Sequence, residues 1–330
     1  MNKSMLKVDH IQFIQNSSCL VTGGAGFIGA NLVEKLVSCG AKRIVVLDDL
    51  STGDLGNIEG YFNADRVEFV NASITELDAI RSTFDRIDIV FQLAALGSVP
   101  RSIDNPVKTN NVNVDGFLNV LVAAKDAGVK KVVYSSSSSI YGDDNTIPKV
   151  EEKIGNPLSP YAVSKRSNEL YAKVFRDVYG MDIIGLRYFN VFGPKQNING
   201  PYAAVIPIFI TNLLKGETCN INGDGTISRD FTFVQNVVEA NILAAWAKIE
   251  LENPVFNVAM GDQISLNELY NKIEDNIGSG LKPIHKEKRI GDILSSLADI
   301  SKAKKYLGYE PGFDFLEGIK QTIEWYRKLY

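Results

Sequence analysis

The sequence predicts an α/β fold, in which a doubly wound parallel sheet is followed by a smaller C-terminal α/β lobe. Three observations indicate this fold. Apolar segments of strand length alternate with amphipathic segments of helix length as far as Phe192. A glycine-rich turn at 22–29 joins the first strand to the first long helix. After Phe192 the alternation stops, and a Gly/Pro/Asn-rich loop over 193–203 leads into shorter helices and strands.

Length and composition narrow the possible classes of function. The 330 residues suffice for one large domain or two ordinary ones, and the net charge of -4 gives no nucleic-acid footprint. No uncharged apolar run approaches the ~20 residues of a membrane span. The three cysteines follow no metal or redox spacing, which is typical of buried thiols in a reducing cytoplasm. With His10 and His285 as the two histidines, we expect no Ser-His-Asp triad and no metal site.

The first part of the chain predicts a dinucleotide-binding unit. The segment before residue 18 lacks a signal-peptide core and fits a short amphipathic helix. Strand 18–21 then runs into the turn, where Gly23 allows the tight bend, Gly26 lets the backbone approach a pyrophosphate and Gly29 permits close packing of helix on strand. Asp48, at the end of the next strand, suits an adenosine ribose and disfavours a 2′-phosphate, so NAD is favoured over NADP. The alternative is a glycine-rich hinge without a ligand.

Further strands are expected near 67–70, 88–93, 132–134 and 183–187, with helices between them. Such a sheet is parallel and Rossmann-like, and its ligands bind at the carboxyl ends of the strands. We therefore expect one crevice to be lined by the segments 22–29, 48–52, 94–101, 135–139 and 188–190.

A tyrosine and a lysine are spaced for catalysis on the helix that follows a run of serines at 135–139. Tyr161 and Lys165 are four residues apart, so they share one helix face. A neighbouring ammonium group favours the phenolate, which suits a general base acting on an alcohol. A serine at the strand end would hold the same alcohol. Taken alone, the spacing also fits an ordinary amphipathic helix.

The chain resembles the extended short-chain dehydrogenase/reductase superfamily, in its NAD-dependent epimerase/dehydratase branch. The resemblance covers nearly the whole chain. It depends on the motifs TGGAGFIG, VLDD, LAA, NNVNVDG, SSSSSIYG, YAVSK, LRYFNVFG, SRDF and RIGD followed by SLAD. The stretches LGSVPRS, NPLSPYAVSK and NVFGPKQNINGPYAAVIP are most similar to UDP-N-acetylglucosamine 4-epimerases. This implies reversible 4-epimerisation through a 4-keto sugar with NAD held throughout, and leaves UDP-glucose open as a further substrate.

The resemblance also implies roles for individual residues. The catalytic residues would be Ser137, Tyr161 and Lys165, with Ser139 as a helper and Ser136 or Ser138 in place of Ser137 if the register slips. The residues implied to hold NAD are Gly23, Gly26, Phe27, Ile28, Gly29, Asp48, Asp49, Ser51, Thr52, Gly53, Ser73, Ile74, Leu93, Ala94, Ala95, Asn113, Tyr161, Lys165, Tyr188 and Val191. Those implied to hold the UDP-sugar are Ser98, Ser137, Ser139, Tyr161, Asn190, Val205, Asn220, Asn222, Arg229, Arg289, Asp292 and Ser296, with Gln196 as a weaker candidate.

The chain departs from the family pattern at two positions. Ser73 stands where an aspartate usually holds the adenine amino group, so the hydrogen bond there would be uncharged and NAD retention weaker. Gln92 stands where a histidine is common, and we expect it to be structural. A third residue, Ser296, stands where galactose-only epimerases carry a tyrosine. Its small side chain would leave room for an N-acetyl group, unless it is merely a small loop residue.

We expect a dinucleotide-binding domain at 1–192 and a UDP-sugar lobe at 193–330, with the chain returning to the first domain near 234–260. In the second lobe, Arg229 and Arg289 resemble the family's diphosphate clamps, and surface salt bridges are the alternative for each. By analogy with the family, helices near 106–128 and 159–179 would build a homodimer.

Three competing functions remain. A 4,6-dehydratase would need an acid where the chain has Ser138 and Ser139. A UDP-glucuronate 4-epimerase or decarboxylase would need a cradle for the sugar carboxylate, and stays the main alternative. A catalytically silent NAD sensor would not need Tyr161 and Lys165.

Overall fold

The computed structural model describes residues 4–62, 65–198, 203–287 and 295–330. Within these residues seven parallel strands form one sheet in the order β3-β2-β1-β4-β5-β6-β11. This is the order of a doubly wound sheet, with the switch point between β1 and β4. The predicted fold class is therefore confirmed.

The strands of this sheet are β1 (Ser18–Thr22), β2 (Arg43–Asp48), β3 (Val67–Asn71), β4 (Ile89–Gln92), β5 (Lys131–Ser137), β6 (Ile183–Tyr188) and β11 (Val255–Val258). The helices around it are α1 (Val8–Gln15), α2 (Phe27–Cys39), α3 (Leu77–Ile80), α4 (Val99–Asp104), α5 (Pro106–Asn110), α6 (Gly116–Asp126), α7 (Pro160–Tyr179), α9 (Val234–Trp246) and α11 (Ser301–Leu307). A π-helical turn, η4 (Asn111–Asp115), joins α5 to α6, and a 3-10 turn, η5 (Ser138–Tyr141), follows β5.

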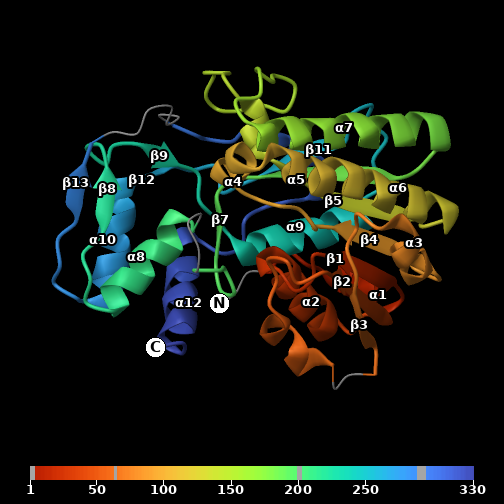
Figure 1. Cartoon of the computed structure of the whole chain (residues 1–330), viewed down its shortest axis with the longest axis horizontal. Helices are drawn as coiled ribbons and strands as arrows, with labels where there is room; N and C mark the ends of the chain where they lie inside the picture. The colour runs from red at the N-terminus through yellow and green to blue at the C-terminus, as the bar shows by residue number, and fades with distance from the viewer. Residues whose placement is uncertain (1–3, 63–64, 199–202, 288–294) are drawn as a thin grey trace.

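The sheet has a hydrophobic core on each face because successive strand residues point to opposite sides. Cys19 and Val21 of β1 pack into the core that α1, α2 and α9 cover. Leu20, between them, packs into the core that α6 and α7 cover. Figure 1 shows these two helix layers on either side of the strands.

Local signals in the sequence account for the ends of α7, the longest helix. The Ser159 hydroxyl accepts a hydrogen bond from the backbone N–H of Ala162 at 3.1 Å, and Pro160 occupies the first helical position. At the other end, Gly180 adopts a left-handed conformation that few other residues tolerate, and the helix stops there. The start of α7 is thus fixed at the residue before Tyr161.

The second lobe consists of α8 (Val205–Leu214), α10 (Leu266–Ile277) and α12 (Phe315–Arg327), with short strands beside them. These strands are paired as β7 (Val191–Phe192) with β10 (Thr232–Phe233), β8 (Asn220–Asn222) with β13 (Ile284–Lys286) and β9 (Ser228–Arg229) with β12 (Ile264–Ser265). The rings of Phe192, Phe233 and Phe315 pack together and make the core continuous between the lobes. Helix α9 and strand β11 return the chain to the large sheet (Figure 1).

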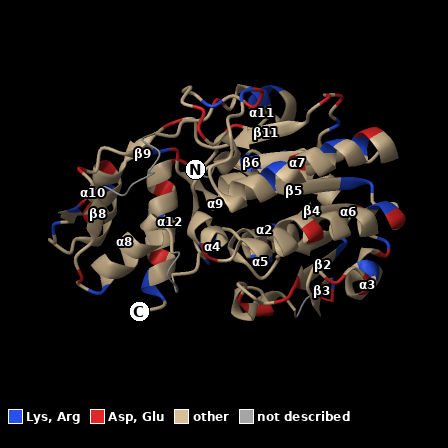
Figure 2. Ribbon diagram, turned by 45° about the horizontal axis from the view of Figure 1, so that its top comes forward, with Lys and Arg blue, Asp and Glu red and all other residues tan. Residues whose placement is uncertain are grey.

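Charged residues of both signs are interspersed over the two lobes (Figure 2). Among the helices that the structure describes, none combines the length and the hydropathy that a membrane span requires.

Candidate active site

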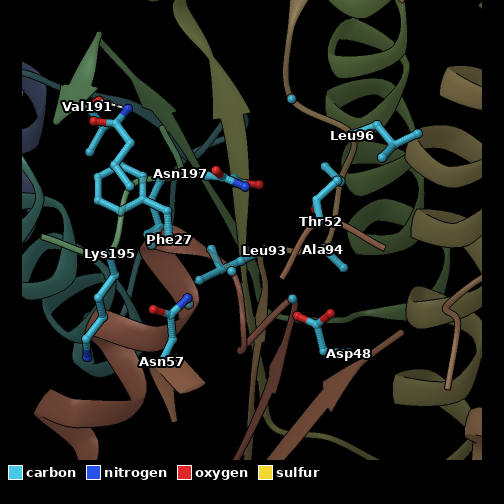
Figure 3. A pocket seen from close by; sticks show the side chains of 18 of the residues that line it. Phe27, Asp48, Thr52, Asn57, Leu93, Ala94, Leu96, Val191, Lys195 and Asn197 are labelled. Carbon is cyan, nitrogen blue, oxygen red and sulfur yellow. Dashed lines mark hydrogen bonds between the residues drawn. The ribbon is translucent and has the colours of Figure 1, made fainter. Parts of the chain in front are cut away.

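A cavity of about 1220 Å³ opens at the carboxyl ends of the strands and extends toward the second lobe. Six strand ends contribute to it, namely those of β1, β2, β3, β4, β5 and β6. Figure 3 shows Phe27, Val191 and Lys195 on one side of this cavity and Asp48 and Thr52 on the other. The expected crevice is therefore present, at the place where doubly wound folds bind ligands.

Most of the residues assigned to the cofactor line this cavity. They are Gly23, Gly26, Phe27, Ile28, Gly29, Asp48, Asp49, Ser51, Thr52, Ile74, Leu93, Ala94, Ala95, Tyr161, Lys165, Tyr188 and Val191. Ser137, Ser139 and Asn190, assigned to the substrate, also line it. The assigned residues that do not belong to the lining of this cavity are Gly53, Ser73, Asn113, Ser98, Val205, Asn220, Asn222, Arg229 and Ser296. Arg289 and Asp292 lie outside the described residues.

The glycine turn is built for close backbone approach. Gly23 has a φ of 65°, and a Cβ atom there would meet the Ala94 backbone at 2.8 Å. A Cβ on Gly29 would overlap the Gly23 carbonyl oxygen, so a side chain would push α2 away from the turn. Gly26 precedes the first residue of α2, a 13-residue helix whose first residues line the cavity, at the end where the helix leaves N–H groups unpaired. These residues fit the diphosphate of a dinucleotide.

Asp48 closes the far side of the turn. Its carboxylate accepts hydrogen bonds from the backbone N–H groups of Ala25 (3.0 Å) and Leu50 (2.8 Å). Burial raises the pKa of Asp48, and these two bonds oppose the rise. Each carboxylate oxygen has a second lone pair, so the side chain can still accept bonds from two ribose hydroxyls.

Ser73 lies behind the lining rather than in it. Its hydroxyl accepts a hydrogen bond from Thr75 Oγ1 at 3.0 Å and interacts with the Asp49 carboxylate. Burial alone would raise the pKa of Asp49, but the bonds from Ser51 and Ser73 bring it below its ordinary value. Asp49 itself lines the cavity beside Ile74, so an acidic group is present near the position where the family motif has its aspartate.

Gln92 and Asn113 hold the cavity wall from behind. Gln92 accepts a hydrogen bond from the Thr22 hydroxyl and donates to the Ala94 carbonyl at 3.1 Å. Asn113, 1% exposed, bonds both backbone groups of Leu96 and donates to the Ser164 hydroxyl at 3.1 Å. Gln92 thus has a structural position. Asn113, expected at the cofactor, holds Leu96 in the loop that begins at Ala94.

The catalytic pair predicted from the sequence lies on one face of α7. Lys165 is buried, and its ammonium donates to the Ser135 carbonyl at 2.9 Å and to the Ser135 hydroxyl at 3.2 Å. Burial lowers the pKa of Lys165 to about 8. Burial also raises the pKa of Tyr161, and a hydrogen bond with Ser137 opposes that rise.

The expected lowering of the pKa of Tyr161 by Lys165 is therefore absent from the structure. The reason is physical: the lysine points its charge at the Ser135 carbonyl, and desolvation dominates for both groups.

The structure determines which of the five serines faces the tyrosine. Ser137 interacts with Tyr161 and accepts a bond from the Ser139 N–H at 3.1 Å. Ser136 donates to Glu169 at 2.6 Å on the other side of the strand, as the alternation of strand side chains requires. The hydroxyl of Ser139 is buried at the cavity without a hydrogen-bond partner. Ser137 is thus the serine that faces Tyr161.

Asn190 connects the strand end to the second lobe. Its amide donates to the Asp230 carbonyl at 2.9 Å and to the Ser296 hydroxyl at 3.4 Å. Ser296 therefore lies one side chain behind the cavity wall. Arg229 donates to the Ser228 carbonyl at 2.8 Å, Asn220 and Asn222 belong to β8, and Ser98 caps the N-terminus of α4.

Sequence reasoning missed a second set of cavity residues. They are Asn57, Tyr61, Lys195, Asn197, Ile198, Trp325, Tyr326 and Leu329. Four residues of the segment 194–198, which crosses between the lobes, lie in this lining, and side chains of α2 and α12 hold the segment. Lys195 pairs with Glu34 of α2 at 2.6 Å and lies over the Tyr61 ring, and Tyr326 of α12 donates to the Gln196 carbonyl at 2.6 Å.

Comparison with known proteins identifies the family of this chain. The model of the NAD dependent epimerase/dehydratase family matches residues 19–259. A UDP-glucose 4-epimerase of Mycolicibacterium smegmatis is 39% identical over 93% of this chain and 98% of its own.

Two solved structures are also similar to the chain. The UDP-N-acetylglucosamine 4-epimerase of Methanobrevibacter ruminantium, in complex with UDP-N-acetylmuramic acid, has a TM-score of 0.91 at 39% identity, over 96% of this chain and 99% of its own. The Thermus thermophilus UDP-glucose 4-epimerase in complex with NAD has a TM-score of 0.84 at 32% identity, over 95% of this chain and 100% of its own. The chain belongs to the NAD-dependent epimerase/dehydratase family, and NAD is its cofactor.

Proposed function

We propose that the protein interconverts UDP-N-acetylglucosamine and UDP-N-acetylgalactosamine by inverting the configuration at C4 of the sugar. The observation that carries this proposal is the pairing of Tyr161 with Ser137 in a cavity that also contains the dinucleotide turn. The similarity to UDP-sugar 4-epimerases supports it.

Each catalytic residue has one task in this reaction. Tyr161 acts as the general base, which takes the proton of the sugar 4-hydroxyl and later returns it, while Ser137 holds the same oxygen by a hydrogen bond. Because burial raises the pKa of Tyr161, this role needs the positive charge of the nicotinamide ring of NAD, which would favour the phenolate when bound nearby. Lys165, beside them, is placed to hold a ribose hydroxyl once the ligand displaces its bond to Ser135. NAD, when bound, supplies a reversible hydride acceptor for the C4 hydrogen. The resulting 4-keto sugar turns before the hydrogen returns to its opposite face, so no net oxidation occurs.

The preference for an acetylated sugar rests on Ser296. This residue contacts Asn190, which lines the cavity, and its side chain is small. A bulky side chain here would displace Asn190 or fill the space beside the sugar. Overpacking of this kind costs about 1–3 kcal/mol, enough to change a substrate preference by tenfold or more.

A UDP-glucuronate 4-epimerase or decarboxylase is the second candidate. The observation in its favour is that Arg101 belongs to the cavity lining. The guanidinium group of an arginine suits a sugar carboxylate. A 4,6-dehydratase activity is not supported, since the cavity end of β5 presents Ser137, Ser138 and Ser139 and no acid.

We also propose a homodimer built on α7. Val163, Leu170, Val174 and Val178 are each more than half exposed, and their spacing places them along one stripe of the helix. Ile103 of α4 and Val107 of α5 extend this apolar surface, and both helices pack beside α7. A second copy of the chain, presenting the same stripe, would bury it.

The test is an NMR time course with NAD and each of UDP-N-acetylglucosamine, UDP-glucose and UDP-glucuronate. We expect a galacto-configured product from the acetylated sugar. Tyr161→Phe should slow its formation by about 10² to 10⁴-fold, since proton transfer is removed. Tyr171→Phe, on the exposed side of the same helix, is the matched control. Carbon dioxide release, or conversion of the glucuronate alone, would replace the proposal by its alternative.

A further inference from the structure

A buried carboxylate continues the catalytic face of α7. Tyr161, Lys165 and Glu169 follow one another at intervals of four residues, so they lie in one row along the helix. Glu169 is only 4% exposed and has no place in the cavity lining. A buried carboxylate needs hydrogen-bonding or ionic partners, and the partners of Glu169 show which elements of the fold it connects.

The carboxylate of Glu169 joins α7 to two neighbouring strands. Both of its oxygens accept bonds from Arg187 of β6, from Nε and from Nη2, each at 2.9 Å. Oε1 also accepts the Ser136 hydroxyl of β5 at 2.6 Å, and Oε2 is 3.2 Å from Arg166 at the surface. Ser136 directly precedes Ser137, which faces Tyr161 on the other side of β5. The Glu169 side chain thereby fixes α7, which carries Tyr161, against β5, which carries Ser137.

Arg187 extends this network toward the second lobe. It is fully buried, and its Nη1 donates to the Tyr141 hydroxyl at 2.9 Å and to the Glu151 carbonyl at 3.0 Å. Tyr141 donates to Asn257 of β11 at 2.7 Å. The Asn257 amide in turn donates to the carbonyl of Asp299 at 3.0 Å. Asp299 follows shortly after Ser296, so the network connects α7 to the segment that contacts Asn190.

We propose that Glu169 and Arg187 are a positioning pair, which holds Tyr161 at a fixed distance from Ser137 and ties that geometry to the second lobe. The proposal rests on the proposed function of this site. Neither member touches the cavity, so both act through other residues.

Stability alone gives no reason for such a pair. Replacing a buried ion pair with apolar side chains of similar volume is often neutral or stabilising, because burying two charges costs desolvation energy. Directional bonds, in contrast, fix distances that an apolar contact leaves loose. The pair carries no net charge and does not contribute to the pKa shifts of Tyr161 or Lys165, so its effect there is geometric. A displacement of about 1 Å at reacting atoms can cost on the order of 10²-fold in rate.

The test is the double variant Glu169→Leu with Arg187→Met, which keeps the volume and removes the directional bonds. We expect its NAD content and its melting temperature with NAD to stay close to those of the parent, KM to change less than threefold, and kcat to fall about 10²-fold. Ser136→Ala, which removes a single bond to Glu169, should fold normally and lower kcat about threefold to tenfold. Arg166→Met is the matched control, because Arg166 contacts the same carboxylate from the surface and should leave kcat unchanged.

A second readout does not depend on turnover. Ionisation of Tyr161 in the NAD-loaded protein is followed by ultraviolet difference absorbance against Tyr161→Phe, and it should shift in the double variant and not in Arg166→Met. A kcat within twofold of the parent in both the double variant and Ser136→Ala, with an unshifted titration, would overturn the proposal and leave the pair a purely structural one. If the parent turns over no UDP-sugar, the proposed function fails, and the titration alone decides the role of the pair.

Discussion

Asn190 and Ser296 meet where the strand end of the dinucleotide half faces the second lobe, with the Asn190 amide 3.4 Å from the Ser296 hydroxyl. This contact brings a residue far along the chain to the back of the cavity wall. It makes the size of the side chain at 296 a determinant of the space beside the sugar.

Ser296→Tyr should therefore change substrate preference. The larger ring would force Asn190 inward at a cost of about 1–3 kcal/mol, so turnover of UDP-N-acetylglucosamine relative to UDP-glucose should fall tenfold or more. Competition between the two sugars, followed by NMR, measures this ratio. Ser296→Ala keeps the small volume and should keep the ratio. An unchanged ratio in Ser296→Tyr would remove residue 296 from the account of specificity.

Asp48→Ala should alter the choice of dinucleotide. The carboxylate lies at the cavity and would repel a 2′-phosphate, so its loss should weaken NAD binding and strengthen NADP binding. Calorimetric titration of cofactor-stripped protein with each dinucleotide gives the ratio of the two affinities. Because a general loss of folding would weaken both affinities alike, the ratio itself is the control. Equal weakening of both would show that Asp48 only shapes the loop through Ala25 and Leu50.

Lys165 should make the stability of the NAD-free protein depend on pH. Its pKa is about 8 in the fold and ordinarily 10.5, so the unfolded chain binds the extra proton between these values and stability rises with pH across that window. Below pH 8 the buried charge costs on the order of 3 kcal/mol at about 1.4 kcal/mol per pH unit.

Lys165→Met removes this cost. Its advantage in melting temperature over the parent should be largest at pH 7 to 8 and should shrink toward pH 10.5. Paired thermal melts of both proteins across this range measure the difference. A difference that does not vary with pH would contradict a buried lysine.

Lys195→Met should speed the release of NAD. Lys195 holds the segment 194–198 to Glu34 and lies 5.4 Å from the centre of the Tyr61 ring, so its loss removes contacts that hold that segment. Dissociation of NAD after dilution, followed by loss of activity, should become severalfold faster while initial turnover stays the same. Lys173→Met breaks a comparable pair with Asp177 away from the cavity and should have no effect. Equal rates in both variants would show that the segment does not retain NAD.

Leu170→Glu should produce a monomer. Leu170 is 52% exposed in the middle of the apolar stripe of α7, and a charge there cannot be buried by a second copy. Light scattering after size exclusion gives the mass directly. Ile208→Glu, on α8 and also exposed, should leave the mass of the dimer unchanged. A parent protein that is itself monomeric at working concentration would refute the proposed interface.

Much of this architecture follows from patterns that are local in the sequence. The alternation of strands and helices, the glycine turn and the four-residue spacing of Tyr161 and Lys165 each depend on neighbouring residues, and the structure has them as expected. Strand alternation separates Ser136 from Ser135 and Ser137, but the choice of the set that faces Tyr161 is not local in the sequence. It depends on Glu169, which occupies the opposite side of β5 and orients Ser136.

The residues that sequence reasoning missed share a different property. Lys195 and Tyr326 reach the cavity from an irregular segment and from the last helix, where no periodic pattern or motif marks a function. Their contacts with Glu34 and with the Gln196 carbonyl join parts of the chain that are far apart in sequence. The pKa of Tyr161 was misjudged for a related reason, since burial is set by the whole fold.

The proposed reaction is tested most directly in deuterated water, with UDP-N-acetylglucosamine as substrate and the C4 position of the sugar observed by NMR. If the hydrogen taken from C4 is the one returned, UDP-N-acetylgalactosamine should form with hydrogen retained at C4, and Tyr161→Phe should suppress its formation. Deuterium at C4 of the product, or no galacto-configured product at all, would contradict the proposed reaction.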